Sequence, residues 1–201
     1  ALERSLVPML VASGFLVFLL GIIDDLRSLH YIYKLVLQIM VSVFVASVGL
    51  ALLGYFRVLI VPVYLLLPLF AGVAVWMLVV TTSFNLVDGL DGLAAGIACI
   101  AGVSFAAAGI ALHQPLAAML AIVTCGAALG FLRYNFPPAT IFMGDSGSLF
   151  LGLLFGLISL LLLIPGTNLF FRAAGNIVIL GVPILDTALA FSRRLATRRS
   201  V

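Results

Sequence analysis

Long apolar runs alternate with short polar segments along the whole chain. The runs cover about residues 5–23, 35–53, 62–83, 93–112, 115–132, 148–164 and 173–191. A run of about 20 apolar residues forms a helix long enough to cross a hydrocarbon core of about 30 Å. Spanning strands are excluded, because the runs do not alternate polar with apolar positions as barrel strands do. The pattern predicts an all-α, polytopic membrane helix bundle with about seven transmembrane helices, forming one domain over residues 1–201.

Two segments depart from this simple alternation. Residues 54–62 read Gly-Tyr-Phe-Arg-Val-Leu-Ile-Val-Pro, which favours a short strand pair. Pro183 lies inside the last apolar run, where a missing N–H and a bulky ring predict a kinked helix.

Composition supports the membrane interpretation. The chain is 65% hydrophobic and 8% charged, with a mean hydropathy of +1.37, whereas a soluble domain has about 25% charged residues. The net charge of +3 does not indicate nucleic-acid binding, because no basic face alternates with aromatic residues. Cys99 and Cys125 lie in apolar runs without metal-ligand spacing, so we expect two buried, reduced thiols.

The acidic residues are few and lie near the ends of the apolar runs. Besides Glu3 they are Asp24, Asp25, Asp88, Asp91, Asp145 and Asp186. Counting helices places all six Asp residues on one face of the membrane. Seven basic residues lie on the same face (Arg27, Lys34, Arg133, Arg193, Arg194, Arg198 and Arg199), and three lie on the other (Arg4, Arg57 and Arg172). The positive-inside rule therefore predicts that the Asp-rich face is cytoplasmic.

The densest polar motif is Asn85-Leu-Val-Asp88-Gly-Leu-Asp91-Gly92. The spacing of three residues brings these side chains to one side of a helix end or a tight loop. Capping of the next helix by Asp91 is the alternative explanation. It accounts for one carboxylate and leaves Asn85 and Asp88 unexplained, so we favour a functional site.

Asp24 and Asp25 form an adjacent pair that follows the first run. Two like charges this close repel each other unless a cation or a shared proton lies between them. Binding of a divalent cation, or a general-base role for one of them, fits this arrangement. The alternative is a solvated loop balanced by Arg27.

A third polar segment contains Asn135-Phe-Pro-Pro-Ala139 and Met143-Gly144-Asp145-Ser146-Gly-Ser148. Asp145 precedes a predicted helix whose first turn, with Gly144 and Ser146, offers N–H groups to a phosphate. Ordinary capping by Asp145 or Ser148 is the alternative. For Asp186, a site role and a pair with Arg193 or Arg194 stay open, whereas His113 lies on the opposite face.

Together these segments resemble those of the polyprenyl-phosphate N-acetylhexosamine-1-phosphate transferases. The matching stretches are Gly21–Leu29, Asn85–Gly96, Asn135–Gly152 and Val182–Thr187, in the same order and at similar spacing. The third stretch is more similar to the branch that initiates teichoic acid, O-antigen or enterobacterial common antigen than to the branch that makes peptidoglycan lipid I.

The resemblance implies an activity in the bacterial plasma membrane, with the site on the cytoplasmic face. The protein would transfer N-acetylhexosamine-1-phosphate from a UDP-sugar, with UDP-GlcNAc favoured, to undecaprenyl phosphate and release UMP. It would need Mg²⁺, for which Mn²⁺ could substitute, and it would bind membrane lipids but no nucleic acid; a homodimer is left open. Expected catalytic residues are Asp24, Asp25, Asp88 and Asp91; substrate contacts are Asn85, Asn135, Gly144 and Ser146; metal ligands are Asp145 and Asp88.

Two elements of that family are not found in the sequence, namely an upstream basic loop carried by two earlier helices and a histidine-rich loop after Arg199. We therefore expect a fragment of a longer enzyme, inactive or nearly so by itself. An Asp-lined cation transporter would need acids at mid-membrane depth. A CDP-alcohol phosphotransferase would need a basic residue where Gly96 stands, and a later Asp pair.

Overall fold

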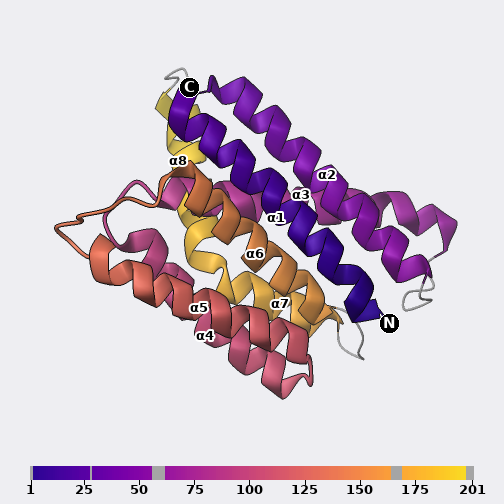
Figure 1. The fold of residues 1–201 in the computed structure, drawn as a ribbon. Coiled ribbons are helices and arrows are strands. Elements are labelled where there is room, and N and C mark those ends of the chain that lie inside the picture. The colour runs from indigo at the N-terminus through magenta and orange to yellow at the C-terminus, as the bar shows by residue number, and fades with distance from the viewer. Residues whose placement is uncertain (1, 28, 56–61, 164–168, 198–201) are drawn as a thin grey trace.

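The computed structural model describes residues 2–27, 29–55, 62–163 and 169–197. These residues form eight helices and no strand (Figure 1): α1 (Leu2–Arg27), α2 (Tyr31–Tyr55), α3 (Val63–Val87), α4 (Leu93–Ala111), α5 (Pro115–Asn135), α6 (Gly144–Leu163), α7 (Leu169–Ile179) and α8 (Gly181–Thr197). The predicted all-α class is confirmed. The predicted strand pair over residues 54–62 falls largely on residues outside the described part of the chain.

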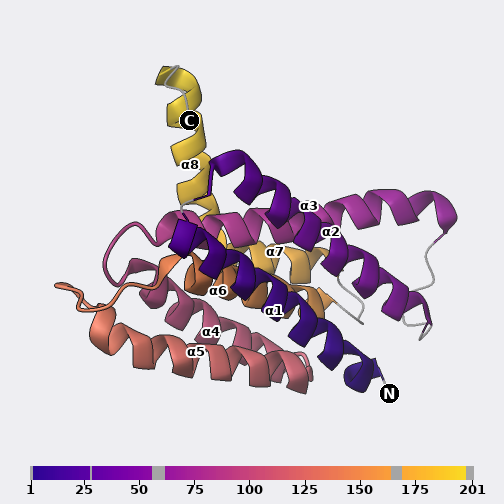
Figure 2. The same ribbon diagram turned by 45° about the horizontal axis from the view of Figure 1, so that its top comes forward.

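Helix α6 is the centre of the bundle. It packs against α1, α3, α4, α5 and α7, and both ribbon views place it between α1 and the α4–α5 pair (Figures 1 and 2). Residues 155–159 of α6 are all buried, as expected for a helix that is apolar on every side. The first turn of α6 is therefore held in a fixed position by its neighbours.

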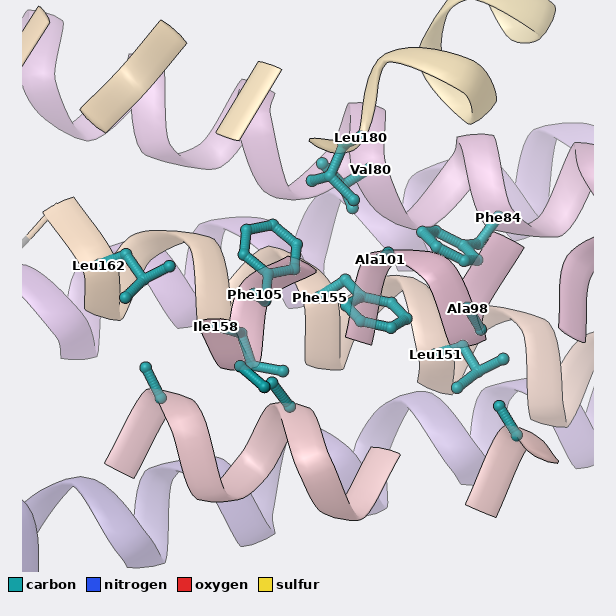
Figure 3. Close-up of a cluster of buried hydrophobic side chains, with 14 residues drawn as sticks. Val80, Phe84, Ala98, Ala101, Phe105, Leu151, Phe155, Ile158, Leu162 and Leu180 are labelled. Carbon is teal, nitrogen blue, oxygen red and sulfur yellow. The ribbon is translucent and has the colours of Figure 1, made fainter. Parts of the chain in front are cut away.

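The larger core cluster joins the helices on the α4 side of α6. Phe155 of α6 stacks against Phe84 of α3 and Phe105 of α4, with ring centroids 5.1 and 5.9 Å apart. Val80 and Leu180 cover this aromatic group in Figure 3. Stacked rings contribute about 0.5–1.5 kcal/mol beyond their buried area, so this cluster fixes α3, α4 and α6 relative to one another.

A second core cluster lies on the other side of α6 and joins it to the first three helices. Its members are Val17, Leu20, Val45, Met77, Leu149, Leu153 and Leu157. The two clusters together surround α6 along most of its length.

Helices α4 and α5 form a tight antiparallel hairpin because small residues line their contact. A Cβ added at Gly102 would lie 2.7 Å from the Cβ of Cys125, and one at Gly109 would lie 2.8 Å from the backbone N of Ala118. Such small residues let membrane helices approach closely. Cys99 and Cys125 are free thiols in this hairpin, as the sequence predicts, but only Cys125 is buried and Cys99 is partly exposed.

Four helices in the described part of the chain, α3 to α6, are each long and apolar enough to cross a membrane. The bent pair α7 and α8 counts as a fifth span if its two parts are taken together, and α2 contains a shorter apolar stretch over Tyr31–Ser47. The predicted number of about seven is larger than this, since it also counted the runs of α1 and α2.

The last predicted helix, over residues 173–191, is divided in two. Helices α7 and α8 meet at Leu180 with a bend of 70°. Pro183 lies in the first turn of α8, where a missing N–H costs no intrahelical hydrogen bond. The helix is therefore not kinked at Pro183, as expected, but broken completely at Leu180, three residues earlier.

Candidate active site

The ends of four helices bring charged side chains together at one end of the bundle. Asp24 and Asp25 lie in the last turn of α1, and Lys34 lies in the first turn of α2. Asp88 follows α3, and Asp145 lies in the first turn of α6. Helices α1, α2 and α6 extend beyond the predicted runs, so their charged residues lie on helical turns, whereas Asp88 lies in the turn after α3.

Lys34 lies between two carboxylates and forms the centre of this group. Its Nζ is 2.8 Å from Oδ2 of Asp24 and 2.5 Å from Oδ2 of Asp145. Asp24 is buried, and its Oδ1 accepts a hydrogen bond of 2.7 Å from the backbone N–H of Leu29. A buried carboxylate needs such partners, because removing its charge from water is costly.

Asn85 orients the other oxygen of Asp145. Its Nδ2 donates to Oδ1 of Asp145 and, at 2.9 Å, to Oγ of Ser148 one turn further along α6. Asp145 therefore has one oxygen directed at Asn85 and the other at Lys34. The Asn85 motif thus meets the third polar segment, as a shared site requires.

Asp25 caps the N-terminus of α6 from a different helix. Its Oδ1 accepts the backbone N–H of Asp145 at 2.7 Å, and its Oδ2 accepts that of Ser146 at 3.1 Å. These are N–H groups that the sequence prediction assigned to a substrate phosphate. Capping by Asp145 or Ser148 themselves, the alternative considered above, is wrong because both lie inside α6.

Two glycines permit this close approach. A Cβ on Gly21 of α1 would lie 2.2 Å from the Cα of Ser146, so no other residue fits there without displacing α6. Gly144 has φ of +68°, which favours glycine, and a Cβ there would lie 3.0 Å from both oxygens of Asp25. The predicted role of Gly144 and Ser146 in substrate binding stays a prediction, and their backbone builds the cap.

Asp88 lies beside the same group from the turn after α3. Its carboxylate accepts the backbone N–H of Gly144. Burial, together with the negative charges of Asp145 and Asp25, raises the pKa of Asp88 to about 6. A cation placed beside Asp88 would therefore stabilise its ionised form.

The turn between α3 and α4 is tied to the segment after α5. Oδ1 of Asn135 accepts the N–H of Gly92 at 2.9 Å, and its Nδ2 donates to the carbonyl of Ile141 at 2.9 Å. Oδ2 of Asp91 accepts the N–H of Ala139 at 3.1 Å. Capping of α4 by Asp91 is wrong, since Gly92 is the N-cap residue and no side chain caps it.

The structure assembles most of the residues that the motifs singled out, with two differences. Asp186 is exposed on α8, and none of the contacts described for the acidic group, formed by Asp24, Asp25, Asp88 and Asp145, includes it. Lys34, conversely, is central to the site, although the sequence analysis used it only in the count of basic residues. Lys34 is the single lysine of the chain, and this was the feature of the sequence that could have identified it as a candidate site residue.

The carboxylates at the helix ends are candidate ligands for a metal ion. No three acidic, histidine or cysteine side chains among the described residues converge closely enough to bind a metal by themselves. Mg²⁺, however, usually takes one or two protein carboxylates and completes its shell with water and substrate phosphate. Asp145 and Asp88 supply two carboxylates of the hard-oxygen type, so the residues fit Mg²⁺ in this mode.

Several helices are long and apolar enough to cross a bilayer, and carboxylates and an ammonium lie together at their ends. These two features define a polytopic membrane protein with a charged site at one end of its bundle. A family model described as glycosyl transferase family 4 matches residues 7–163, which contain every member of the acidic group. The chain belongs to this family.

Three relatives illustrate the similarity. The chain is 37% identical over 197 residues to a probable undecaprenyl-phosphate N-acetylglucosaminyl 1-phosphate transferase of Bacillus subtilis, which covers 96% of this chain and 54% of that protein. It is 31% identical over 220 residues to the decaprenyl-phosphate N-acetylglucosaminephosphotransferase of Mycolicibacterium smegmatis, at 96% and 53% coverage. It is 36% identical over 171 residues to the phospho-N-acetylmuramoyl-pentapeptide-transferase of Clostridium beijerinckii, at 77% and 52% coverage. The chain thus spans about half the length of the curated relatives that it matches.

Proposed function

We propose that the protein transfers N-acetylhexosamine-1-phosphate from a UDP-sugar, with UDP-GlcNAc preferred, to undecaprenyl phosphate and releases UMP. The reaction would take place at the cytoplasmic face of a bacterial plasma membrane and begin the synthesis of an envelope polysaccharide. The observation that carries the proposal is the group formed by Asp24, Lys34 and Asp145 at the helix ends. The names of the relatives support the class of substrates.

The position of the charged group suits two substrates that arrive from different phases. A polyprenyl phosphate reaches the site from the bilayer and a sugar nucleotide reaches it from water, so their phosphates meet at the boundary. The acidic residues lie in the last turn of α1, after α3 and in the first turn of α6. A transporter pathway would instead need charged groups near mid-membrane depth, and nothing in the geometry favours that alternative.

The proposed reaction exchanges one phosphorus–oxygen bond for another. An oxygen of the lipid phosphate bonds to the β-phosphorus of the UDP-sugar, and the bond from that phosphorus to the bridging oxygen breaks. UMP leaves with the electron pair, and no proton has to move if the lipid phosphate is already ionised. The residues therefore need to position and neutralise phosphates more than to transfer protons.

We assign the binding of Mg²⁺, or Mn²⁺ in its place, to Asp145 and Asp88. When bound, such an ion neutralises phosphate charge and polarises the phosphorus that is attacked. Asn85 holds the Asp145 carboxylate in one orientation, and Asp25 holds the start of α6 in place. Asp24 and Lys34 are assigned to the lipid phosphate, and the Asp91 and Asn135 contacts shape the nucleotide side.

The experiment that tests this proposal uses the full-length protein in detergent or vesicles. The protein is incubated with undecaprenyl phosphate and Mg²⁺, and release of UMP is followed over a panel of UDP-sugars. We expect UMP only when both substrates are present, with UDP-GlcNAc or a close N-acetylhexosamine donor giving the fastest release. Asp145→Asn should abolish the signal, and Asp186→Asn, outside the acidic group, should keep it. If protein shown to be folded releases UMP from none of the donors in the panel, the proposal is overturned.

A further inference from the structure

Lys34 differs from every other basic residue of the chain. The nine others are arginines, and the ammonium of Lys34 bridges two carboxylates of the site. Its side chain is only 19% exposed. Arginine presents a rigid, planar fork, whereas lysine is a compact, hydrated point charge on a flexible four-carbon stem. A lysine can therefore leave one partner and take another more easily than an arginine can.

In each of the two carboxylates, one oxygen already accepts a hydrogen bond from another part of the protein. Oδ1 of Asp145 is taken by Asn85, and Oδ1 of Asp24 is taken by the N–H of Leu29. The remaining oxygen of each residue, Oδ2, faces the Nζ of Lys34. A cation that reaches Asp145 through its Oδ2 therefore needs the position that Lys34 now holds.

An ammonium and a divalent cation cannot share that oxygen without strong repulsion. Like charges at contact distance repel each other more strongly near a protein surface than in water, and a doubly charged ion doubles the repulsion. The repulsion ends when the ammonium moves away. Asp24 keeps the stem of Lys34 nearby, because its Oδ2 is a second partner for the ammonium.

We propose that Lys34 is a displaceable cation: it holds Asp24 and Asp145 together until a divalent cation takes Oδ2 of Asp145, and it then presents its ammonium to the substrate phosphate. This inference rests on the proposed function, which assigns the metal to Asp145. It makes Lys34 a positioning residue before the metal arrives and a phosphate ligand afterwards. A permanent structural ion pair would behave differently, since its ammonium would stay covered in both states.

Lys34 is the single lysine of this chain, so the peptide that contains it reports on one side-chain amine. The full-length protein is treated briefly with an amine-acylating reagent, and acylation of the peptide that contains Lys34 is measured by mass spectrometry. We expect Mg²⁺ to raise the labelling rate of Lys34 several-fold, and KCl at matched ionic strength to leave it unchanged. In Asp145→Asn the rate should no longer respond to Mg²⁺, whereas in Asp186→Asn the Mg²⁺ response should equal that of the parent.

A second measurement follows metal binding independently of the labelling of Lys34. Binding of Mn²⁺ is followed by electron paramagnetic resonance on the same preparations, without substrate. Lys34→Gln removes the competing ammonium and should bind Mn²⁺ more tightly than the parent, and Lys34→Arg, which keeps the charge, should not.

The outcomes distinguish the inference from the function on which it rests. Mn²⁺ binding that needs Asp145 but leaves Lys34 labelling unchanged overturns the inference and leaves the proposed function intact. A decrease in Mn²⁺ affinity in Lys34→Gln also overturns it. Mn²⁺ binding that is absent, or independent of Asp145, overturns the metal assignment and the inference with it.

Discussion

The carboxylate of Asp25, at the end of α1, accepts the backbone N–H of Asp145, at the start of α6, over 2.7 Å. The two residues are 120 positions apart in the chain. A carboxylate at a helix N-terminus satisfies free N–H groups and interacts favourably with the helix dipole. The contact thus fixes the turn that carries Asp145 to the helix that carries Asp24.

Asp25→Ala should lower the melting temperature of the protein, because it removes the carboxylate that caps α6. Loss of a cap costs about 0.5–2 kcal/mol, which for a chain of this size lowers Tm by about 1–8 °C at about 2–4 °C per kcal/mol. Thermal unfolding in detergent measures this effect, and Asp186→Ala on the exposed face of α8 is the control. Equal melting temperatures for Asp25→Ala and the parent would show that the cap does not stabilise α6.

Gly21→Ala should be strongly destabilising. The added methyl group would lie 2.2 Å from the Cα of Ser146, and overpacking of this kind costs about 1–3 kcal/mol. Gly126→Ala is the matched control, because a Cβ at Gly126 meets nothing within 4 Å; there alanine should stabilise the helix by about 0.5–1 kcal/mol. Unfolding midpoints of the two variants should therefore shift in opposite directions, and a neutral Gly21→Ala would contradict the close packing of α1 on α6.

The roles assigned to Asp145 and Asp24 can be separated by two isosteric variants. Asp145→Asn should abolish turnover and weaken Mg²⁺ binding, whereas Asp24→Asn should lower turnover and largely keep Mg²⁺ affinity. Isothermal titration of Mg²⁺ in the presence of the nucleotide measures this. If Asp145→Asn binds Mg²⁺ as the parent does and Asp24→Asn does not, the two roles are reversed.

Metal affinity should rise with pH up to about 6 because of Asp88. The folded, metal-free protein raises the pKa of this carboxyl from 3.8 to about 6. Between these values the folded state binds the proton more tightly, so the contribution of Asp88 to stability falls as pH rises. A metal needs the ionised carboxylate, so its affinity increases over the same window and levels off above about pH 6.

Titration of Mn²⁺ binding from pH 5 to 7.5 tests the effect of Asp88. In Asp88→Asn the rise should be smaller and the affinity at neutral pH lower than in the parent. An identical pH profile in the parent and in Asp88→Asn would remove Asp88 from the metal site.

Cysteine labelling tests which side of the membrane carries the site. In a background of Cys99→Ala and Cys125→Ala, Ala139→Cys should react with an impermeant maleimide only from the cytoplasm, because Ala139 lies beside Asp91. Gln114→Cys, between α4 and α5, should react only from outside. Labelling of both positions from one side would contradict the crossing of α5.

The sequence predicts the positions of the helices well because length and hydropathy are local properties. The run predicted over 93–112 and α4 (Leu93–Ala111) agree within one residue. Helix ends were predicted less well, since the first run was expected to end at about residue 23, whereas α1 continues to Arg27 and includes Asp24 and Asp25. The polar residues continue α1 because Leu29, Lys34 and the start of α6 satisfy their side chains.

The partners within the site could not be predicted because they depend on packing between distant segments. Lys34 and Asp145 are 111 residues apart, and no local pattern indicates which carboxylate the lysine contacts. Asn135 was expected to touch substrate, yet it is buried and its amide joins Gly92 to Ile141. The residue types indicated the chemistry of the site. Which of these residues bond to other parts of the protein could be seen only in the fold.

The tight hairpin of α4 and α5 has a mechanical consequence for the site. Gly92 precedes α4 and Asn135 ends α5, so the segments bonded to each other lie at the same open end of one hairpin. Helices tilt when bilayer thickness and hydrophobic length do not match. Because glycines bring α4 and α5 together and the stack of Phe105 on Phe155 ties α4 to α6, the hairpin cannot tilt without α6. A change in bilayer thickness should therefore tilt the Asp91 and Asn135 segments together with Asp145 and leave the distances between them unchanged.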